Sequence, residues 1–431
     1  MTGTGTTATA EPSIFDRVEI PDELVRAARD KRWPDGLLER ALRLRVSRGD
    51  VQYWLDNGVA ERFAKYLGDR ERVMFGTLRV REATWMDDEA VADLYAHSPE
   101  EIGEWEVTVE RSPYPFAQFR LQENANVQIV EDRGIVLGAA AHSGRNTIVD
   151  GKRVTCHIAS AWRVRSEFRG QGVTNLMRTL GGPCMSWFGL INYWYMRAGN
   201  FSAVDWLKAL RPDLAEAAVE REGTLPGAPV TVHHFRTRPF DGDATGIRKV
   251  PRSDTRRCVA LINRTHRGLD FFRPYSEDFL RLRLDDRGWG PKPHFITAVY
   301  GWDDYYILEE AGRVIACAGL WDRGRDVREV WRHKTSGETI VVAPTALMDF
   351  GFAAGREDAM ERLLGYLIGV SHGLGRHELL APIEQLPALL ERVAGLEPAA
   401  ETRHMGVDGF HEAGLDIDVT VHRPYTDLAY W

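Results

Sequence analysis

A strand, a glycine-bearing loop and the start of a helix follow one another between residues 154 and 180, and this stretch constrains the fold more than any other. An apolar run with several β-branched residues covers 154–164. Arg169, Gly170 and Gly172 then form a loop, and apolar residues at helical spacing follow it. The sequence therefore predicts a strand-to-helix junction at this point.

Such a junction is suited to binding phosphate. The first N–H groups of a helix have no partner within the helix, and the helix dipole adds partial positive charge there. Gly170 and Gly172 remove the side chains that would hold a diphosphate away from these N–H groups, and Arg169 adds a charged contact. Because glycine also occurs in loops that only reverse the chain, these residues alone do not define a binding site.

The residues around the loop resemble motif A of the GNAT superfamily, the acyl-CoA-dependent N-acyltransferases. The family signature is Arg/Gln-x-x-Gly-x-Gly/Ala; Arg169 and Gly172 fit it, and Thr174 stands where Gly or Ala is usual. Asn200 opens an Asn-x-x-Ala motif after a strand-like run. The resemblance covers residues 77–238. The acyl-CoA-binding residues that it implies are Trp162, Val164, Arg169, Gly170, Gln171, Gly172, Val173, Thr174 and Asn200.

The resemblance also implies the reaction, which is direct transfer from acetyl-CoA or another acyl-CoA to a primary amine of a small molecule or peptide. The amine attacks the thioester carbonyl, backbone N–H groups of a splayed strand polarise this carbonyl, and pantetheine lies along the strand edge near residues 162–164. No metal is expected. The main role of the protein is to position the two reactants.

The groups that transfer protons are harder to assign. Members of the family often place Tyr seven residues after the motif Asn, as the acid for the leaving thiolate, and this chain has Leu207 there. Counting alternate residues back from Val164 puts Trp162 and Ser160 on one face of the strand and His157 on the other. This count favours a packed role for His157 rather than a catalytic one.

Other residues remain as candidates for catalysis. Glu104 lies beside Trp105, whose ring can desolvate the carboxylate and stack a substrate, so we predict Glu104 as the base. Cys184 would imply a covalent, ping-pong route instead, but its apolar surroundings favour packing. The predicted catalytic residues are Glu104, Ser160 and Tyr193, with Glu106 as the alternative to Glu104 and Tyr195 as the alternative to Tyr193.

Composition limits the class of protein. The 431 residues are too many for one core, and the net charge of −8 argues against nonspecific nucleic-acid binding while favouring an amine substrate. The four cysteines form no Cys-x-x-Cys pair and are typical of free thiols in a reducing compartment. Residues 1–20 lack the features of a signal peptide, and no apolar run is long enough to span a membrane. We therefore expect a cytosolic protein.

The N-terminal region, residues 21–76, has apolar residues at the spacing of three short helices. Part of it, residues 36–56, has the rhythm of a helix-turn-helix. Arg45 stands where that motif usually has Gly, and Glu39 and Asp50 dilute the basic charge. We expect a helical region packed on the catalytic domain, and nucleic-acid binding is not expected.

The order of elements in the first GNAT-like region recurs after a turn-rich linker at 238–243, which predicts an α/β protein with two tandem GNAT-like domains. Each has a mixed, mostly antiparallel sheet flanked by helices. In the second domain the loop around Gly355 lacks the second glycine, and Glu357 and Asp358 would repel a diphosphate. We expect it to bind no CoA and to build part of the acceptor pocket or a dimer surface. The predicted regions are a disordered lead-in (1–20), the helical region (21–76), the catalytic domain (77–240) and the second domain (241–431).

Three other functions are compatible with the sequence. The chain is alternatively an acyl-CoA-binding regulator without catalysis, a thioester hydrolase on the same fold, or a DNA-tethered sensor that uses residues 36–56. Turnover separates the regulator from the enzymes, a free-acid product identifies the hydrolase, and salt-dependent DNA retention supports the sensor. The sequence leaves the acceptor, the acyl chain length and the oligomeric state open.

Overall fold

The computed structural model describes most of the chain outside the N-terminal lead-in. Some predictions fall outside the described residues: the lead-in at 1–20, the loop residues 170–172, and Cys184, Asn200 and Leu207. The structure describes residues 21–34, 36–44, 46, 51–52, 54–55, 60–111, 115–123, 125–149, 151–169, 173–174, 177, 191–197, 228–285, 299–408, 425–426 and 428.

The chain divides into two compact units, residues 1–79 and residues 80–431. The described helices of the first unit are α1 (Asp22–Asp30), α2 (Leu37–Arg43) and α4 (Ala60–Phe75). The helix α1 begins after Pro21 with two acidic residues in its first turn, which suits the helix dipole. Leu24, Ala41, Phe63 and Leu67 are among the apolar residues that the three helices bury against one another.

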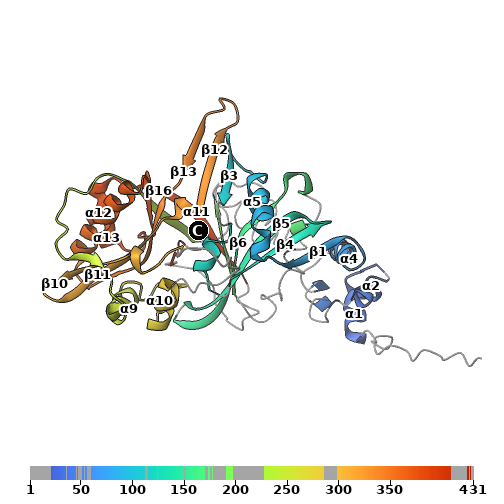
Figure 1. The fold of residues 1–431 in the computed structure, drawn as a ribbon. Coiled ribbons are helices and arrows are strands. Elements are labelled where there is room, and N and C mark those ends of the chain that lie inside the picture. The colour runs from blue at the N-terminus through green and yellow to red at the C-terminus, as the bar shows by residue number, and fades with distance from the viewer. Residues whose placement is uncertain are drawn as a thin grey trace, which may run out of the picture. The chain divides into compact units, whose positions relative to one another are not determined.

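The second unit is built on one twelve-stranded sheet, in the order β1-β4-β5-β6-β7-β16-β8-β15-β14-β11-β10-β9 (Figure 1). We call residues 80–240 the first half of this unit and residues 241–431 the second half. The first strand, β1, begins two residues before the unit boundary. The strands are β1 (Leu78–Glu82), β4 (Asn126–Asp132), β5 (Ile135–Val149), β6 (Lys152–Val164), β7 (Ile191–Arg197), β8 (Ala228–Arg236), β9 (Ile247–Lys249), β10 (Tyr305–Glu310), β11 (Arg313–Trp321), β14 (Thr345–Phe352), β15 (Glu378–Ala381) and β16 (Ala399–Asp408).

The two halves exchange their last described strands at the centre of the sheet. The strand β16, from the second half, pairs with β7 of the first half, and β8, from the first half, pairs with β15 of the second half. The strands β8 and β16 pair with each other between these neighbours. The predicted boundary between residues 240 and 241 thus divides the sequence, while the sheet joins the halves through exchanged strands.

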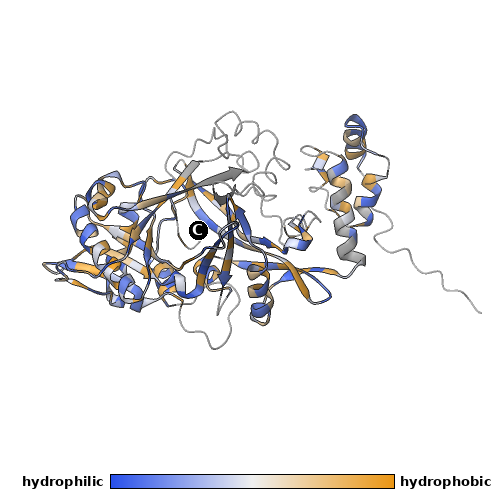
Figure 2. Cartoon of the chain, turned by 90° about the horizontal axis from the view of Figure 1, so that it is seen from above, coloured by the Kyte–Doolittle hydropathy of each residue, from blue (hydrophilic) through white to orange (hydrophobic). Residues whose placement is uncertain are grey.

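Amphipathic helices pack against this sheet (Figure 2). In the first half, α5 contributes Val91, Leu94 and Tyr95 to a core with the apolar residues of β4 and β5. In the second half, α12 buries its apolar residues against β10, β11 and β14. The described helices of the second unit are α5 (Asp88–Ala96), α9 (Thr255–Thr265), α10 (Glu277–Leu284), α11 (Arg323–Asp326), α12 (Glu357–Gly373) and α13 (Pro387–Val393).

A second, four-stranded sheet joins the halves again, in the order β13-β12-β3-β2. Its strands β12 (Val327–His333) and β3 (Trp105–Arg111) pair antiparallel along seven residues. The outer strands are β13 (Thr339–Val342) and β2 (Glu100–Ile102). Figure 1 shows the β12–β13 hairpin standing beside β3. Residues 100–111 of the first half therefore supply two strands of this sheet.

The two halves contain equivalent clusters of ion pairs, which supports the tandem arrangement. In the first half, Arg81 on β1 contacts Asp87, six residues later, and Glu131 at the end of β4. In the second half, Arg248 on β9 contacts Asp254, again six residues later, and Glu309 near the end of β10. In both halves the guanidinium joins the first strand to the start of a helix and to the next strand of the sheet.

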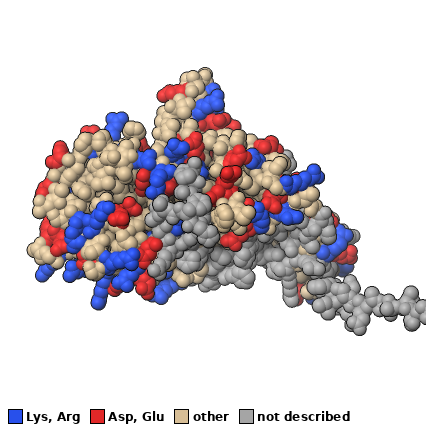
Figure 3. Space-filling view, in the orientation of Figure 1, with Lys and Arg blue, Asp and Glu red and all other residues tan. Residues whose placement is uncertain are grey.

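None of the helices in the described part of the chain is long and apolar enough to cross a membrane. On the face seen in Figure 3, Lys and Arg are interspersed with Asp and Glu wherever residues are described. A mixed surface of this kind lacks the single-sign field that attracts nucleic acid. Cys156, Cys258 and Cys317 are free and buried.

Candidate active site at the first strand fork

The strands β6 and β7 pair only over a short distance and then separate. Their parallel register joins residues 156–158 of β6 to residues 191–193 of β7, ending at Ile158 and Tyr193. We call the place where these strands part the first fork. Beyond Ile158, the backbone groups of β6 on this side are therefore not paired with β7. A strand edge of this kind can pair with an extended ligand such as pantetheine.

A β-bulge lies three residues beyond the end of this pairing. The register between β5 and β6 shifts after Ala139, and Ala161 has a φ of +54°, in the left-handed region. The buried Tyr95 hydroxyl of α5 donates a hydrogen bond to the Ala161 carbonyl oxygen. A left-handed alanine is strained by about 1 kcal/mol or more, so the surrounding contacts must hold it. Tyr95 is one of these contacts.

The bulge corrects the prediction of which side chains share a face. Because one extra residue is inserted at Ala161, the alternation of faces reverses there. Ser160 pairs with Ala141 on one face, whereas Trp162 lies beside His142, with ring centroids 5.9 Å apart. His142 also contacts His157. The prediction that Trp162 and Ser160 share a face, with His157 opposite, is therefore wrong, because it counted β6 as an uninterrupted strand.

The two histidines form a stacked pair at the start of the fork. The rings of His142, on β5, and His157, on β6, have centroids 5.2 Å apart and planes 11° apart. His142 Nδ1 lies 3.0 Å from His157 Nε2, so the N–H of one ring donates a hydrogen bond to the nitrogen of the other. Burial, and to a smaller extent the charge of His157, lowers the pKa of His142 to about 3. Counting alternate residues along β6 did not predict this pair. The sequence feature that could have indicated it is the presence of one histidine on each of two adjacent strands.

The predicted phosphate loop is described only at its ends. A short 3-10 turn (Ser166–Phe168) precedes Arg169, which is exposed and donates hydrogen bonds to the carbonyl oxygens of Pro99 at 2.6 Å and Val164 at 3.4 Å. Val173 is buried and Thr174 is half-buried. A Cβ on Gly138 would lie 2.8 Å from Val173 Cγ1, so the residues after the loop pack closely on β5. Gly170, Gln171, Gly172 and Asn200 remain predictions.

The predicted catalytic residues occupy separate places. Glu104 lies in the turn between β2 and β3, its side chain is 82% exposed, and it contacts His333 at 3.3 Å. Water therefore surrounds this carboxylate, and the predicted desolvation by Trp105 is not present. Ser160 lies one residue before the bulge, and its buried Oγ makes no hydrogen bond within the described part of the chain. Tyr193 is the last residue of β7 paired with β6. Their roles remain predictions.

The second half has a fork of the same construction. The strands β14 and β15 pair in parallel only through Thr345 and Ala346, and we call their separation the second fork. Asp349, three residues beyond, has a φ of +47° at a register shift between β11 and β14. The Tyr305 hydroxyl donates to the Asp349 carbonyl oxygen at 2.6 Å. A bulge held by a tyrosine hydroxyl therefore occurs at the same position of both forks.

Helix α9 meets the backbone of the second fork. Thr265 Oγ1 accepts a hydrogen bond from the Phe352 N–H at 2.8 Å and lies 3.3 Å from the Phe352 carbonyl oxygen. His266 Nε2 donates to the Phe350 carbonyl oxygen at 2.9 Å. Phe350 and Phe352 follow the bulge by one and three residues, as Trp162 and Val164 do in the first fork. In the first fork, the equivalent stretch of backbone is where pantetheine is predicted to bind. In the second fork, side chains of the protein itself form hydrogen bonds with this stretch.

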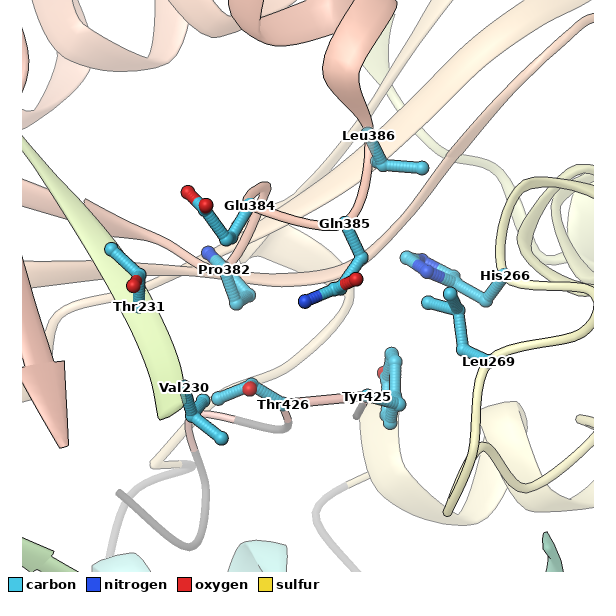
Figure 4. Close-up of a pocket in the computed structure, with 10 residues that line it drawn as sticks. All are labelled: Val230, Thr231, His266, Leu269, Pro382, Glu384, Gln385, Leu386, Tyr425 and Thr426. Atoms are coloured by element: carbon cyan, nitrogen blue, oxygen red, sulfur yellow. The ribbon is translucent and has the colours of Figure 1, made fainter. Parts of the chain in front are cut away.

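A small pocket lies beside the second fork (Figure 4). In this view Gln385 lies between His266 on one side and Thr231 on the other, and the Glu384 carboxylate points away from the centre. Glu384 contacts His233 Nε2 at 2.8 Å. The pocket is lined by Val230, Thr231, His266, Leu269, Pro382, Glu384, Gln385, Leu386, Tyr425 and Thr426. Among the described residues, no group of three or more His, Cys, Asp or Glu side chains is arranged to hold a metal ion.

The paired strand forks, each with a bulge and a following helix, place the chain in the GNAT fold class, in the predicted tandem arrangement. The fold resembles that of N-myristoyltransferase from Saccharomyces cerevisiae with bound myristoyl-CoA, with a TM-score of 0.54, 8% identity, and coverage of 77% of this chain and 78% of that chain. A second structure of that enzyme with myristoyl-CoA gives a TM-score of 0.53 at 10% identity, covering 77% of this chain and 83% of that chain. At such identities the likeness establishes the fold alone.

A GCN5-related N-acetyltransferase from Sphaerobacter thermophilus aligns more loosely. Its TM-score is 0.43 at 15% identity, with coverage of 82% of this chain and 99% of that chain. No protein-family model and no curated protein matches the sequence.

Proposed function

We propose that the chain is an acyl-CoA-dependent N-acyltransferase that binds its donor at the first fork. One observation carries this proposal: β6 leaves its neighbour after Ile158, forms a bulge at Ala161, and leads directly into the glycine-bearing loop. This arrangement brings an available strand edge and a phosphate-binding loop to one place. The fold shared with an enzyme that binds myristoyl-CoA supports an acyl-CoA donor.

The residues of the first fork would divide the work as follows. Arg169 and the N–H groups of Gly170 and Gly172 bind the diphosphate, and the backbone near Trp162 and Val164 holds pantetheine. A backbone N–H at the bulge polarises the thioester carbonyl, because the bulge turns it away from the β5 ladder. The amine nitrogen then bonds to the carbonyl carbon and loses a proton, the C–S bond breaks with its electron pair leaving on sulfur, and the thiolate takes up a proton.

The finer parts of the proposal concern the substrates. We propose acetyl-CoA as the donor and a primary amine of a small molecule or peptide as the acceptor; the net charge of −8 favours a cationic acceptor. We propose that the second half binds no CoA. The three free, buried cysteines are compatible with a cytosolic location, and a homodimer is compatible with the sequence.

Calorimetric titration with acetyl-CoA, myristoyl-CoA and CoA tests the donor site. We expect one site per chain, with the tightest acyl-CoA identifying the chain length. No binding of any of the three would contradict the assignment of the acyl-CoA site to the first fork. Two sites per chain would contradict the proposal that the second half binds no CoA. Release of CoA thiol is then measured with and without added amines. Amine-dependent release with amide product supports transfer, and equal release without amine identifies a hydrolase.

A further inference from the structure

The His142–His157 pair occupies the place in the first fork where a base is needed. His157 lies one residue before the last residue of β6 that pairs with β7, and Trp162, beyond the bulge, approaches the same pair. These side chains share a face of the sheet with Gly138, over which Val173 packs. The pair is therefore close to the bulge that would hold the thioester and to the residues that follow the predicted phosphate loop.

Resting on the proposed function, we infer that His157 is the general base of the transfer and that His142 is its positioning residue. As the amine nitrogen bonds to the thioester carbon, it releases one proton, which His157 accepts. Both ring nitrogens of His157 then carry protons, and its Nε2–H donates to His142 Nδ1. The C–S bonding pair leaves with sulfur, and solvent supplies the proton of the CoA thiol, so His157 returns its own proton to solvent after each turnover.

The surroundings of the pair decide which histidine becomes charged. His142 Nε2 is buried and forms no hydrogen bond with the described residues, so a charged His142 would leave one N–H without a partner there. Burial lowers the pKa of His142 to about 3, which keeps this ring neutral and able to accept a hydrogen bond. A neutral acceptor 3.0 Å from His157 Nε2 stabilises the charged form of His157.

Two other ionisable groups of these strands, Cys156 and Arg145, lie on the opposite face. Cys156 and Arg145 are opposite each other in the β5–β6 register and point away from the His pair. Burial raises the pKa of the Cys156 thiol to about 12, so it stays protonated at neutral pH. The two histidines thus act as a unit, in which the His157 ring accepts the proton and the His142 ring orients the His157 ring.

His157→Gln and His142→Leu test the two roles separately. We expect His157→Gln to lower kcat at least 100-fold while the Kd for acyl-CoA stays within threefold. His142→Leu is expected to lower kcat about tenfold and to move the acidic limb of the kcat profile to lower pH, because the charged His157 loses its acceptor. His142→Asn, which retains an acceptor near the Nδ1 position, should partly restore both. His97→Gln, at the exposed end of α5, is the control and should change neither.

Several outcomes would overturn the inference without touching the proposed function. A kcat of His157→Gln within twofold of the wild type would do so, as would a 100-fold loss in Glu104→Gln with His157 dispensable. Histidine-ring NMR of the wild type gives a test that does not depend on turnover. We expect the pair to take up its first proton on His157 rather than on His142, with both rings shifting when acyl-CoA binds. A charged His142, or rings indifferent to a bound acyl-CoA, would contradict the assignment; absence of all acyl-CoA binding would instead contradict the proposed function.

Discussion

The two forks have the same backbone plan, but different groups meet the strand beyond the bulge. In the first fork the Trp162 carbonyl accepts a hydrogen bond from Arg163, and the Val164 carbonyl from Arg169, both long side chains near the strand end. In the second fork Thr265 and His266, at the end of α9, bond to the equivalent strand positions. Arg169 is exposed and can leave when a ligand arrives, whereas a residue fixed by a helix cannot leave without moving the helix.

The difference arises from small changes in sequence. Measured from the equivalent aspartates Asp87 and Asp254, α9 is two residues longer than α5, with 11 residues against nine, and these two residues carry Thr265 to the strand. A Cβ on Gly351 would lie 2.4 Å from the Ile262 nitrogen, so a glycine on β14 allows α9 to approach this closely. The second half therefore keeps the backbone arrangement of the first fork, although the end of α9 covers the strand edge.

The loops after the two bulged strands differ in charge. Arg169 donates its hydrogen bonds to carbonyl oxygens, and none of the described carboxylates forms an ion pair with it. Arg356, before α12, instead contacts two carboxylates, Asp358 at 3.0 Å and Glu310 at 2.9 Å. An anionic diphosphate would meet a positive group in the first half and a neutralised one, flanked by acidic side chains, in the second.

The largest expected effect comes from placing a carboxylate in each loop. Gly172→Asp sets a negative charge beside the predicted diphosphate site, and we expect the affinity for CoA and acetyl-CoA to fall at least 100-fold, or about 3 kcal/mol. Gly355→Asp is the matched control, since Gly355 has a φ of +70° and open space around its Cβ position. It should cost only backbone strain and leave CoA binding unchanged. Calorimetry on both variants decides; equal losses would show that both loops bind the donor.

A smaller effect is expected at the tyrosines that hold the two bulges. Tyr95→Phe removes the donor to the Ala161 carbonyl oxygen, so the bulge relaxes and kcat should fall about tenfold, while the Kd for acyl-CoA changes less than threefold. Tyr305→Phe removes the same bond at Asp349 and should lower the free energy of unfolding by about 1 kcal/mol without changing kcat. Steady-state kinetics and urea unfolding of both variants provide the comparison. If Tyr305→Phe lowered kcat as much as Tyr95→Phe, the second bulge would also serve catalysis.

Local sequence patterns were sufficient to predict individual elements. The apolar run at 154–164 lies within β6, and the helical spacing in residues 21–76 marks the region that forms α1, α2 and α4, because each of these elements depends on neighbours in the sequence. The GNAT fold and the tandem arrangement followed from motif order, and the fold is confirmed by the likeness to solved structures. The bulge was not predictable by counting alternate residues, since one inserted residue leaves the apolar pattern of β6 nearly intact.

Contacts between distant segments account for the rest of what sequence reasoning missed. Nothing local in β8 shows that it pairs with β15 rather than remaining beside the other strands of its own half. Likewise β3 pairs with β12, more than 200 residues away, in a sheet that neither segment suggests alone. His142 and His157 meet for the same reason, because the register of a long hairpin, not their spacing in the chain, brings their rings together.

The smallest expected effect concerns the exchanged strands that join the two forks in one sheet. His234 on β8 contacts Glu378 on β15 at 3.1 Å and Glu401 on β16 at 3.3 Å. Burial alone would lower the pKa of His234, but hydrogen bonds and charges of these glutamates outweigh it and raise the pKa to about 9. A folded-state pKa above the ordinary value of 6.5 means that this stabilisation is complete below about pH 6.5 and is lost as the pH rises through about 9. Since Glu378 is 40% exposed and screened by water, we expect a contribution of about 1 kcal/mol.

Urea unfolding of the wild type and of His234→Gln, compared from pH 6 to pH 10, measures this contribution. The two free energies of unfolding should differ by about 1 kcal/mol at pH 6 and converge near pH 10, because only the charged histidine holds both glutamates. The control is His372→Gln, an exposed position in the last turn of α12, which should run parallel to the wild type at every pH. A constant difference for His234→Gln would assign its effect to packing. The exchanged strand would then be held by its backbone ladder with β15 and β16, and the two forks would stay joined in alkali as firmly as at neutral pH.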